Sequence, residues 1–281
     1  MTDYTYPKPS MEGVSTPPAS DLWLTCPAPK PQAALRLFCF HYAGGNALSF
    51  RTWLAQLPPN VEGCLVELPG HGMGLLKPPF TRLEPLIAAL HQALLPSLTK
   101  PFAFFGHSMG ALVSFELARS LRRAQHPFPL HLFVSGQRSP QVPDPDPPIH
   151  ALPESEFLNQ LRRYNGTPEE VLNNAELMQL LLPTLRADFA VIETYYYTHE
   201  PPLDCSISAL GGLQDWKTNP ANLEAWRAQT QAAFDLKLFP GDHFFIYTVQ
   251  SQVLSYLCRK LNQVAEQASY PPGNKYQQLS P

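Results

Sequence analysis

The chain has 281 residues, 44% of them hydrophobic, which is enough to bury one large core. Only 15% of the residues are charged, the formal net charge is −3, and Lys and Arg form no cluster. A mildly acidic chain of this kind lacks the basic surface that nucleic acid or an anionic membrane attracts, so we expect neither partner. The most apolar stretch, Leu86–Leu98, contains polar residues and is too short to span a bilayer, which predicts a soluble protein.

Thirty-two prolines gather in three segments that mark the expected boundaries. Residues 1–34 form a Pro-rich arm without hydrophobic periodicity, which we expect to be flexible. Residues 269–281 form a C-terminal tail of similar composition. The third cluster, residues 140–153, interrupts the domain and leads into an insertion at about residues 151–198. The folded domain is therefore expected to span residues 35–268.

The five cysteines are odd in number, scattered and without a C-x-x-C pair. This usage predicts reduced, mostly buried thiols rather than a disulfide framework or a zinc site. The N-terminus has neither the charged region nor the apolar region of a secretory signal. We therefore expect a cytoplasmic protein, and a monomer because no additional apolar edge is evident.

Between the Pro-rich segments, strand and helix patterns alternate. Six short apolar runs each end at Gly or Pro, as is typical of buried parallel strands. These runs are Leu35–Phe40, Cys64–Leu68, Phe102–Phe105, Leu130–Ser135, Ile207–Leu210 and Leu236–Phe239. Apolar residues at helical spacing fill several gaps, over Leu83–Leu98, Gly110–Arg123 and Val249–Gln267. The alternation predicts an α/β fold with a mostly parallel central sheet flanked by helices.

The insertion at residues 151–198 is expected to be helical and is unusually apolar. Pro153 followed by Glu154 and Glu156 is a suitable helix start. One interpretation is a pair of packing helices. The interpretation that we favour is a helical lid whose apolar face covers an acyl-binding cleft.

Residues 106–110, Gly-His-Ser-Met-Gly, form a G-x-S-x-G motif. The motif follows a predicted strand and opens a predicted helix, which is the setting of a nucleophile elbow. Glycines flank the serine because the turn is too tight for side chains there. The alternative is an ordinary strand-to-helix turn in which the serine caps the helix. We take Ser108 as the candidate nucleophile.

A serine nucleophile needs a general base, which in this architecture follows it in the chain. His243 comes just after the last predicted strand, in a loop that is placed to reach the serine, and is the predicted base. The other four histidines beyond Ser108 lie in a strand or in polar or Pro-flanked connections, where surface or packing roles are expected. They are His126, His131, His150 and His199.

The base in turn needs an acid that orients it. Asp215 follows a predicted strand and a Gly-Gly turn, which puts it at a strand's carboxyl end. Asp242 is adjacent to His243, and neighbouring side chains in an extended loop point apart. Asp204 and Asp235 precede their strands and belong to the opposite edge of the sheet. The predicted acid is therefore Asp215, with a buried structural carboxylate as the alternative.

Two backbone amides are expected to form the oxyanion hole. One belongs to Met109, and the other to the loop after the first strand of the domain, where Ala43 or Tyr42 is the expected donor. Candidate substrate contacts are Tyr42, Gly44, His107 and Phe244. For His107 a satisfied core histidine is the favoured alternative. No metal site and no cofactor are expected.

Six motifs, in this order, resemble the type II thioesterases that accompany polyketide and nonribosomal peptide synthetases, members of the α/β-hydrolase superfamily. They are HYAGG at 41–45, LPGHG at 68–72, GHSMG at 106–110, LPTLRAD at 182–188, LGGLQD at 210–215 and FPGDHFF at 239–245. The resemblance runs from about Leu35 to Leu261. Two departures stand out: His41-Tyr42 occupies a place where the family often has Pro-His, and His71 one where it often has Arg.

The resemblance implies an editing thioesterase that removes aberrant acyl groups from phosphopantetheinylated carrier proteins through a serine acyl-enzyme. It implies the triad Ser108, Asp215 and His243, with the amides of Met109 and Ala43 as the oxyanion hole. One alternative is a standalone medium-chain fatty-acyl thioesterase or an esterase acting on free acyl-CoA or small esters. A remote alternative is a non-enzymatic nucleotide-binding α/β protein, suggested by the glycines of residues 70–74.

Overall fold

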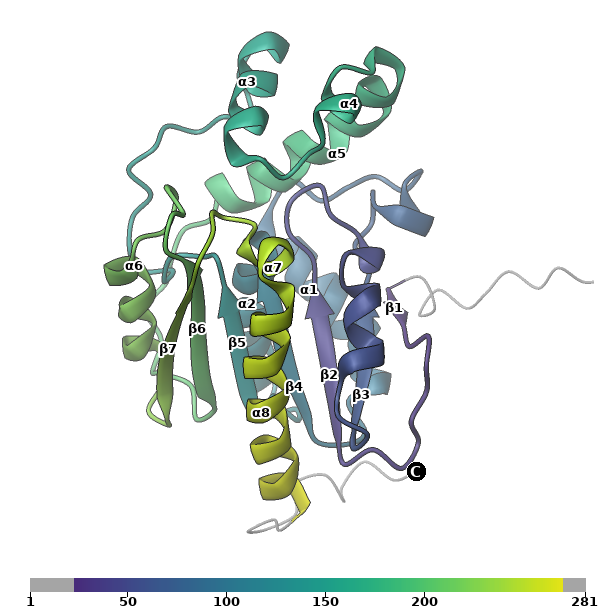
Figure 1. The fold of residues 1–281 in the computed structure, drawn as a ribbon, viewed down its shortest axis with the longest axis vertical. Coiled ribbons are helices and arrows are strands. Elements are labelled where there is room, and N and C mark those ends of the chain that lie inside the picture. Colours follow the sequence, from purple (N-terminus) through teal and green to yellow (C-terminus); the bar gives the residue numbers. More distant parts are fainter. Residues whose placement is uncertain (1–22, 270–281) are drawn as a thin grey trace, which may run out of the picture.

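The computed structural model describes residues 23–269, which fold around a seven-stranded sheet of order β1-β3-β2-β4-β5-β6-β7 (Figure 1). All neighbouring strands are parallel except β1, which is antiparallel to β3. The strands are β1 (Leu24–Thr25), β2 (Leu35–Phe40), β3 (Val61–Val66), β4 (Phe102–His107), β5 (His131–Ser135), β6 (Ser206–Gly212) and β7 (Phe234–Phe239). The expected fold, a mostly parallel sheet flanked by helices, is confirmed.

Helices cover both faces of the sheet and its carboxyl edge. The α-helices are α1 (Leu83–Leu94), α2 (Met109–Arg123), α3 (Glu154–Tyr164), α4 (Glu169–Leu172), α5 (Ala175–Glu193), α6 (Pro220–Glu224), α7 (Phe245–Thr248) and α8 (Gln250–Ser269). Short 3-10 helices are η2 (Ala47–Gln56), η3 (Gly72–Gly74), η4 (Leu95–Ser97) and η5 (Ala225–Gln229).

Alternate side chains of the buried strands build two cores, one on each face of the sheet. Phe38 and Phe40 of β2 pack into the core shared with α1 and α2. Leu37, just before Phe38, and Cys39, between the two phenylalanines, pack into the core shared with η2 and α8. Because both faces are covered, every residue of the strand except Arg36 is apolar, which is why such runs were recognisable in the sequence.

The start of β3 lies earlier than the sequence predicted, at Val61 instead of Cys64. Glu62 is buried in this first half, where it accepts a hydrogen bond from Arg36 Nε at 2.7 Å. Gly63 leaves room for Leu54 of η2. A charged residue and a glycine interrupt the hydrophobic pattern, so the sequence did not predict this part of the strand. In the fold, the ion pair with Arg36 compensates for the burial of Glu62, and the close approach of η2 requires Gly63.

The insertion forms three helices, α3, α4 and α5, above the carboxyl ends of the strands (Figure 1). The predicted start is confirmed, since Pro153 is the N-cap of α3 and Glu154 and Glu156 lie in its first turn. The helices have a core of their own, in which Phe157 of α3 contacts Phe189 of α5. They are therefore held together as a unit over the sheet edge.

The last third of the predicted arm is part of the fold. Leu24 and Thr25 form β1, and Cys26, next in line, is joined by a disulfide to Cys64 of β3. The prediction that all five cysteines are reduced is therefore wrong for this pair, because antiparallel pairing of β1 brings the two Cα atoms to 4.4 Å. The other predictions for the arm and tail, over residues 1–22 and 270–281, lie outside the described residues.

No helix within residues 23–269 is both long and apolar enough to cross a membrane.

The disulfide leads to a stability prediction. It closes a loop of 38 residues, so replacing Cys26 by Ser is expected to lower the free energy of unfolding by about 2–4 kcal/mol. Urea unfolding under non-reducing conditions measures this loss. Cys258→Ser is the matched control, because the Cys258 thiol is not part of a disulfide. Thiol titration of the denatured, non-reduced protein should count three thiols, and a count of five would contradict the prediction.

Candidate active site

Parallel pairing brings the predicted catalytic residues to one edge of the sheet. Ser108 follows β4, Asp215 follows β6 and His243 follows β7. These strands run in the same direction, so their carboxyl ends lie together. Three side chains separated by up to 135 residues along the chain therefore meet in space.

Ser108 stands at a strained turn between β4 and α2. Its φ is +52°, a region that residues other than glycine rarely occupy, and its amide donates to Ser135 O at 2.7 Å. A Cβ on Gly106 would collide with the backbone of Gly110, and one on Gly110 would collide with Phe40 O. The side chain of Ser108 makes no capping hydrogen bond to α2, so the turn presents the hydroxyl instead of capping the helix.

His243 links the serine to the carboxylate. Its Nε2 lies 3.1 Å from Ser108 Oγ and its Nδ1 lies 2.8 Å from Asp215 Oδ2. The imidazole and the carboxyl group are almost completely buried. Both distances are within hydrogen-bond range, so the three side chains form a connected nucleophile–base–acid array.

Asp215 stays ionised in this environment. Burial alone would raise its pKa, but the hydrogen bond and charge of His243, the Thr218 hydroxyl at 2.5 Å and the Lys217 amide at 2.8 Å lower the pKa below its ordinary value overall. An ionised carboxylate only accepts, so His243 Nδ1 must donate to it. His243 Nε2 then carries a lone pair, which faces Ser108 Oγ.

The other acids stay away from His243, as expected. Asp242 accepts from Asn165 Nδ2 at 3.0 Å and from the amide of Phe244 at 2.9 Å. Asp235 lies near the start of β7, at the opposite edge of the sheet, where it accepts from Tyr256. Asp204 precedes β6 and accepts from Gln231.

The predicted oxyanion donors lie beside the serine. Met109 is the first residue of α2, and the first amides of a helix have no partner within it. Ala43 lies in the loop after β2 and lines the same cavity as Ser108. Met109 and Ala43 therefore stay the predicted oxyanion donors.

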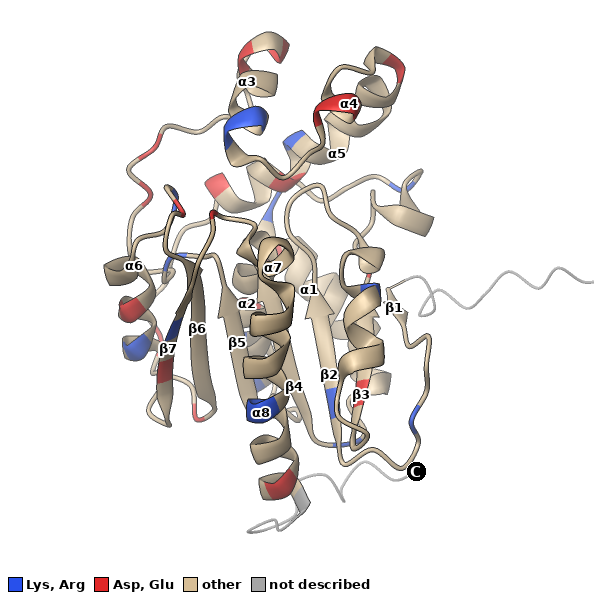
Figure 2. Cartoon of the chain, in the orientation of Figure 1, with Lys and Arg blue, Asp and Glu red and all other residues tan. Residues whose placement is uncertain are grey.

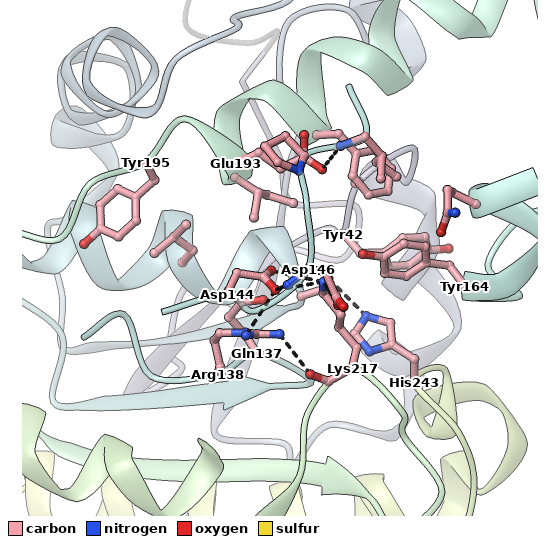
Figure 3. A pocket seen from close by; sticks show the side chains of 18 of the residues that line it. Tyr42, Gln137, Arg138, Asp144, Asp146, Tyr164, Glu193, Tyr195, Lys217 and His243 are labelled. Carbon is pink, nitrogen blue, oxygen red and sulfur yellow. Dashed lines mark hydrogen bonds and ion pairs between the residues drawn. The ribbon is translucent and has the colours of Figure 1, made fainter. Parts of the chain in front are cut away.

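A cavity of about 740 Å³ opens above Ser108 and His243, between the sheet edge and the inserted helices. Side chains of the inserted helices line it together with the Pro-rich segment before α3. Figure 3 shows Tyr42, Tyr164 and His243 on one side of the cavity and Tyr195 on the other. The volume is within the range of sites that bind small organic molecules.

Of the four candidate substrate contacts, Tyr42 and Phe244 line this cavity. Their rings contact each other at 4.9 Å. Gly44 lies behind the wall, with its amide bonded to Asp188. His107 is placed differently from the prediction: it is fully buried, its Nδ1 lies 2.9 Å from Ser135 Oγ, and it does not line the cavity. The favoured alternative, a core histidine, describes its position.

A charged cluster in the cavity wall escaped the sequence analysis. Lys217 contacts Asp144 and Asp146, and Arg138 contacts Asp144 at 3.2 Å (Figure 3). Arg138 also donates to Lys217 O and is almost fully buried. These bonds fasten the Pro-rich segment to the loop that carries Asp215. The Pro-rich composition indicated a linker, and nothing in it indicated this pairing.

No group of three or more His, Cys, Asp or Glu side chains within residues 23–269 is arranged to hold a metal ion.

The strained serine at a strand-to-helix turn, the buried His–Asp pair and the parallel sheet define a serine hydrolase of the α/β-hydrolase type. A family model described as Thioesterase domain matches residues 35–263. The chain therefore belongs to the thioesterase family, and it is a hydrolase that acts on thioesters.

Three similar proteins show how far the likeness extends along the chain. Linear gramicidin dehydrogenase LgrE of Brevibacillus parabrevis is 49% identical over 83% of this chain and 90% of its own length. Gramicidin S biosynthesis protein GrsT of Aneurinibacillus migulanus is 44% identical, over 83% and 91%. Among solved structures, the type II thioesterase BorB from the borrelidin biosynthetic cluster has a TM-score of 0.78 and 33% identity, over 85% of this chain and 98% of that one.

The geometry predicts which of the two carboxylates near His243 is needed for hydrolysis. Asp215→Asn is expected to reduce kcat by about 10⁴-fold, because the amide favours the wrong tautomer of His243. Asp242→Asn removes a carboxylate one position from the same histidine and is expected to change kcat less than about fivefold. Steady-state thioester hydrolysis measures both variants. A larger effect at Asp242 than at Asp215 would contradict the assignment.

Proposed function

We propose that this chain is an editing thioesterase, which hydrolyses aberrant acyl thioesters from phosphopantetheinylated carrier proteins of a polyketide or nonribosomal peptide synthetase. The observation that carries the proposal is the array of Ser108, His243 and Asp215 at the floor of a cavity covered by helices. The similarity to proteins of gramicidin and borrelidin biosynthesis favours this role over a fatty-acyl thioesterase. The expected monomer and cytoplasmic location stay predictions.

Hydrolysis proceeds through a serine acyl-enzyme. His243 Nε2 removes the proton from Ser108 Oγ as this oxygen attacks the thioester carbonyl. The amides of Met109 and Ala43 stabilise the oxyanion, each by about 3–4 kcal/mol. The C–S bond breaks, and the imidazolium returns its proton to the departing sulfur. The thiol leaves readily because it is far more acidic than an alcohol.

Water then completes the cycle. His243 takes a proton from a water molecule as it attacks the acyl-serine carbonyl, and the second tetrahedral intermediate collapses to release the carboxylic acid. The proton held by His243 passes to Ser108 Oγ. Asp215 holds the ring in place during both half-reactions and balances the charge of the imidazolium.

A dinucleotide-binding role is disfavoured. In a dinucleotide fingerprint the glycine-rich turn opens a helix directly after a strand. Here the glycines of residues 70–74 follow β3 and pass into the three-residue helix η3, and α1 begins only at Leu83. The loop therefore lacks the dinucleotide-binding turn that the word dehydrogenase in the name of LgrE would suggest.

The last turn of α3 offers a positively charged contact for the carrier arm. Arg162 and Arg163 are exposed there, at the end of α3 that faces the sheet (Figure 2). Arg163 lines the cavity, and its guanidinium lies 3.9 Å from the ring centre of Trp216. Its charge also helps to lower the pKa of the Asp146 carboxyl group. We propose that Arg163 meets the phosphate of the phosphopantetheine arm, whereas Arg138, which also lines the cavity, is almost fully buried and less accessible.

The function is tested by comparing two thioesters of one acyl group. Release of acetate from an acetylated carrier protein is expected to be at least tenfold more efficient, in kcat/KM, than hydrolysis of acetyl-CoA. Ser108→Ala is expected to abolish both reactions. Equal or better turnover of acetyl-CoA would instead indicate a hydrolase of free thioesters.

The contact with the carrier arm is tested at Arg163. Arg163→Glu reverses the charge beside the cavity and is expected to raise KM for the acetylated carrier about tenfold, with a smaller change in kcat. Arg227→Glu is the matched control, since this exposed arginine lies on η5 and is paired with Glu224. An equal effect of both variants on KM would rule out a specific role for Arg163.

A further inference from the structure

A buried carboxylate of the lid contacts the loop that carries the predicted oxyanion donor. Asp188 lies on α5, and its Oδ2 accepts from the amide of Gly44 at 2.7 Å. The same oxygen lies 2.9 Å from Nε2 of His71, in the loop after β3. Both side chains of this pair are almost fully buried. One oxygen atom thus joins the lid helix to two loops at the sheet edge.

The surroundings of His71 select its charged form. Nε2 faces the Asp188 carboxylate, and Nδ1 faces the carbonyl oxygens of Leu68 and Pro69 at 3.3 and 3.2 Å. All of these groups accept hydrogen bonds, so both ring nitrogens must donate, which only the imidazolium does. Burial alone would lower the pKa of His71, but Asp188, the Pro69 carbonyl and Glu67 raise the pKa above its ordinary value overall.

The same stretch of α5 also packs on these loops. Leu185, one turn before Asp188, fills the space beside Gly44: a Cβ built on this glycine would lie 2.5 Å from Leu185 Cδ2. The φ of Gly44 is +75°, so a side chain there would also be strained. Thr184 donates through Oγ1 to Gly70 O at 3.0 Å. Packing and hydrogen bonds from one helix therefore fix both loops.

We propose that Asp188 is a positioning residue, which holds the Gly44 amide so that the neighbouring Ala43 amide points at the oxyanion. The inference rests on the proposed oxyanion hole and adds a role for the lid to it: α5 sets the geometry of the donor as well as covering the cavity. An oxyanion donor works only when it is held in place before the charge develops. A small displacement of this loop lowers transition-state stabilisation without weakening substrate binding.

This arrangement also gives the enzyme a dependence on pH. The charged or titratable groups that face His71 are Asp188 of α5, Glu67 after β3 and His41 after β2, whose ring centre is 4.6 Å away. Because the pKa of His71 is raised above its ordinary value, the imidazolium persists to higher pH than in a free histidine, and the ion pair is lost as the pH rises through that pKa. The neutral ring then turns a lone pair toward an acceptor, and the hold on the Gly44 loop weakens.

The test uses the complete enzyme and p-nitrophenyl acetate, so it does not depend on a carrier. Asp188→Ala removes the acceptor and is expected to lower kcat at least tenfold with KM changed less than threefold. Asp188→Asn keeps an acceptor without the charge, so its loss is expected to be smaller. Binding of a trifluoromethyl ketone, which forms an oxyanion on Ser108, should weaken in parallel with kcat. Asp235→Ala is the matched control, an ion-paired aspartate at the opposite sheet edge.

Three outcomes overturn the inference: unchanged kcat in Asp188→Ala, a rise in KM that accounts for the loss, or an equal loss in Asp235→Ala. Ser108→Ala in the same assay tests the proposed mechanism separately. If this variant keeps its activity, the serine mechanism fails; if it is inactive, an unchanged kcat in Asp188→Ala counts against the role of Asp188 alone. If the Asp188 variants do not fold, His71→Arg supplies a cation that does not titrate. The His71→Arg variant should keep the kcat of the wild type near neutral pH and should not lose kcat as the pH rises. A decline of kcat at high pH like that of the wild type would contradict the proposal.

Discussion

The parallel pairing of β4, β5, β6 and β7 is the constraint on which the rest of the site depends. It places the turns after three separate strands at one edge, so the hydroxyl, imidazole and carboxylate meet there without any of them being close in sequence. Helices on both faces bury the strands and hold their ends rigidly. The strained backbone of Ser108 is tolerated because this frame surrounds it, and the strain presents the hydroxyl to His243.

A second layer of organisation comes from the insertion. Its helix α5 reaches down to the loops after β2 and β3 through Leu185 and Asp188, while α3 carries Tyr164 and Arg163 to the cavity. The cover over the active site and the wall of the predicted oxyanion hole are thus parts of one unit with its own core. A shift of α5 would therefore move both the cavity wall and the loop that carries Gly44.

Local patterns were sufficient to predict the parallel part of the sheet and to name three side chains that meet at its edge. Gly106–Gly110 between a strand and a helix, and Asp215 and His243 at strand ends, each combine a residue type with a position along a predicted element. The missed features depend on pairs that are distant in sequence. Two-residue β1 has no periodicity, so nothing in the sequence indicated the partner of Cys26. The ion pair between Asp188 and His71 joins a helix to a loop 117 residues away in the chain. His107 was ambiguous because burial depends on neighbours that only the fold supplies.

The central claim is that Ser108 becomes acylated and that water then releases the acid. The most direct measurement is rapid chemical quench of the enzyme with an acyl thioester in excess, followed by mass spectrometry of the intact protein and its peptides. The account predicts one acyl group per chain, located on the peptide that contains Ser108 and absent from Ser108→Ala. Turnover with no acylated protein at any quench time, or acylation at another residue, would contradict it.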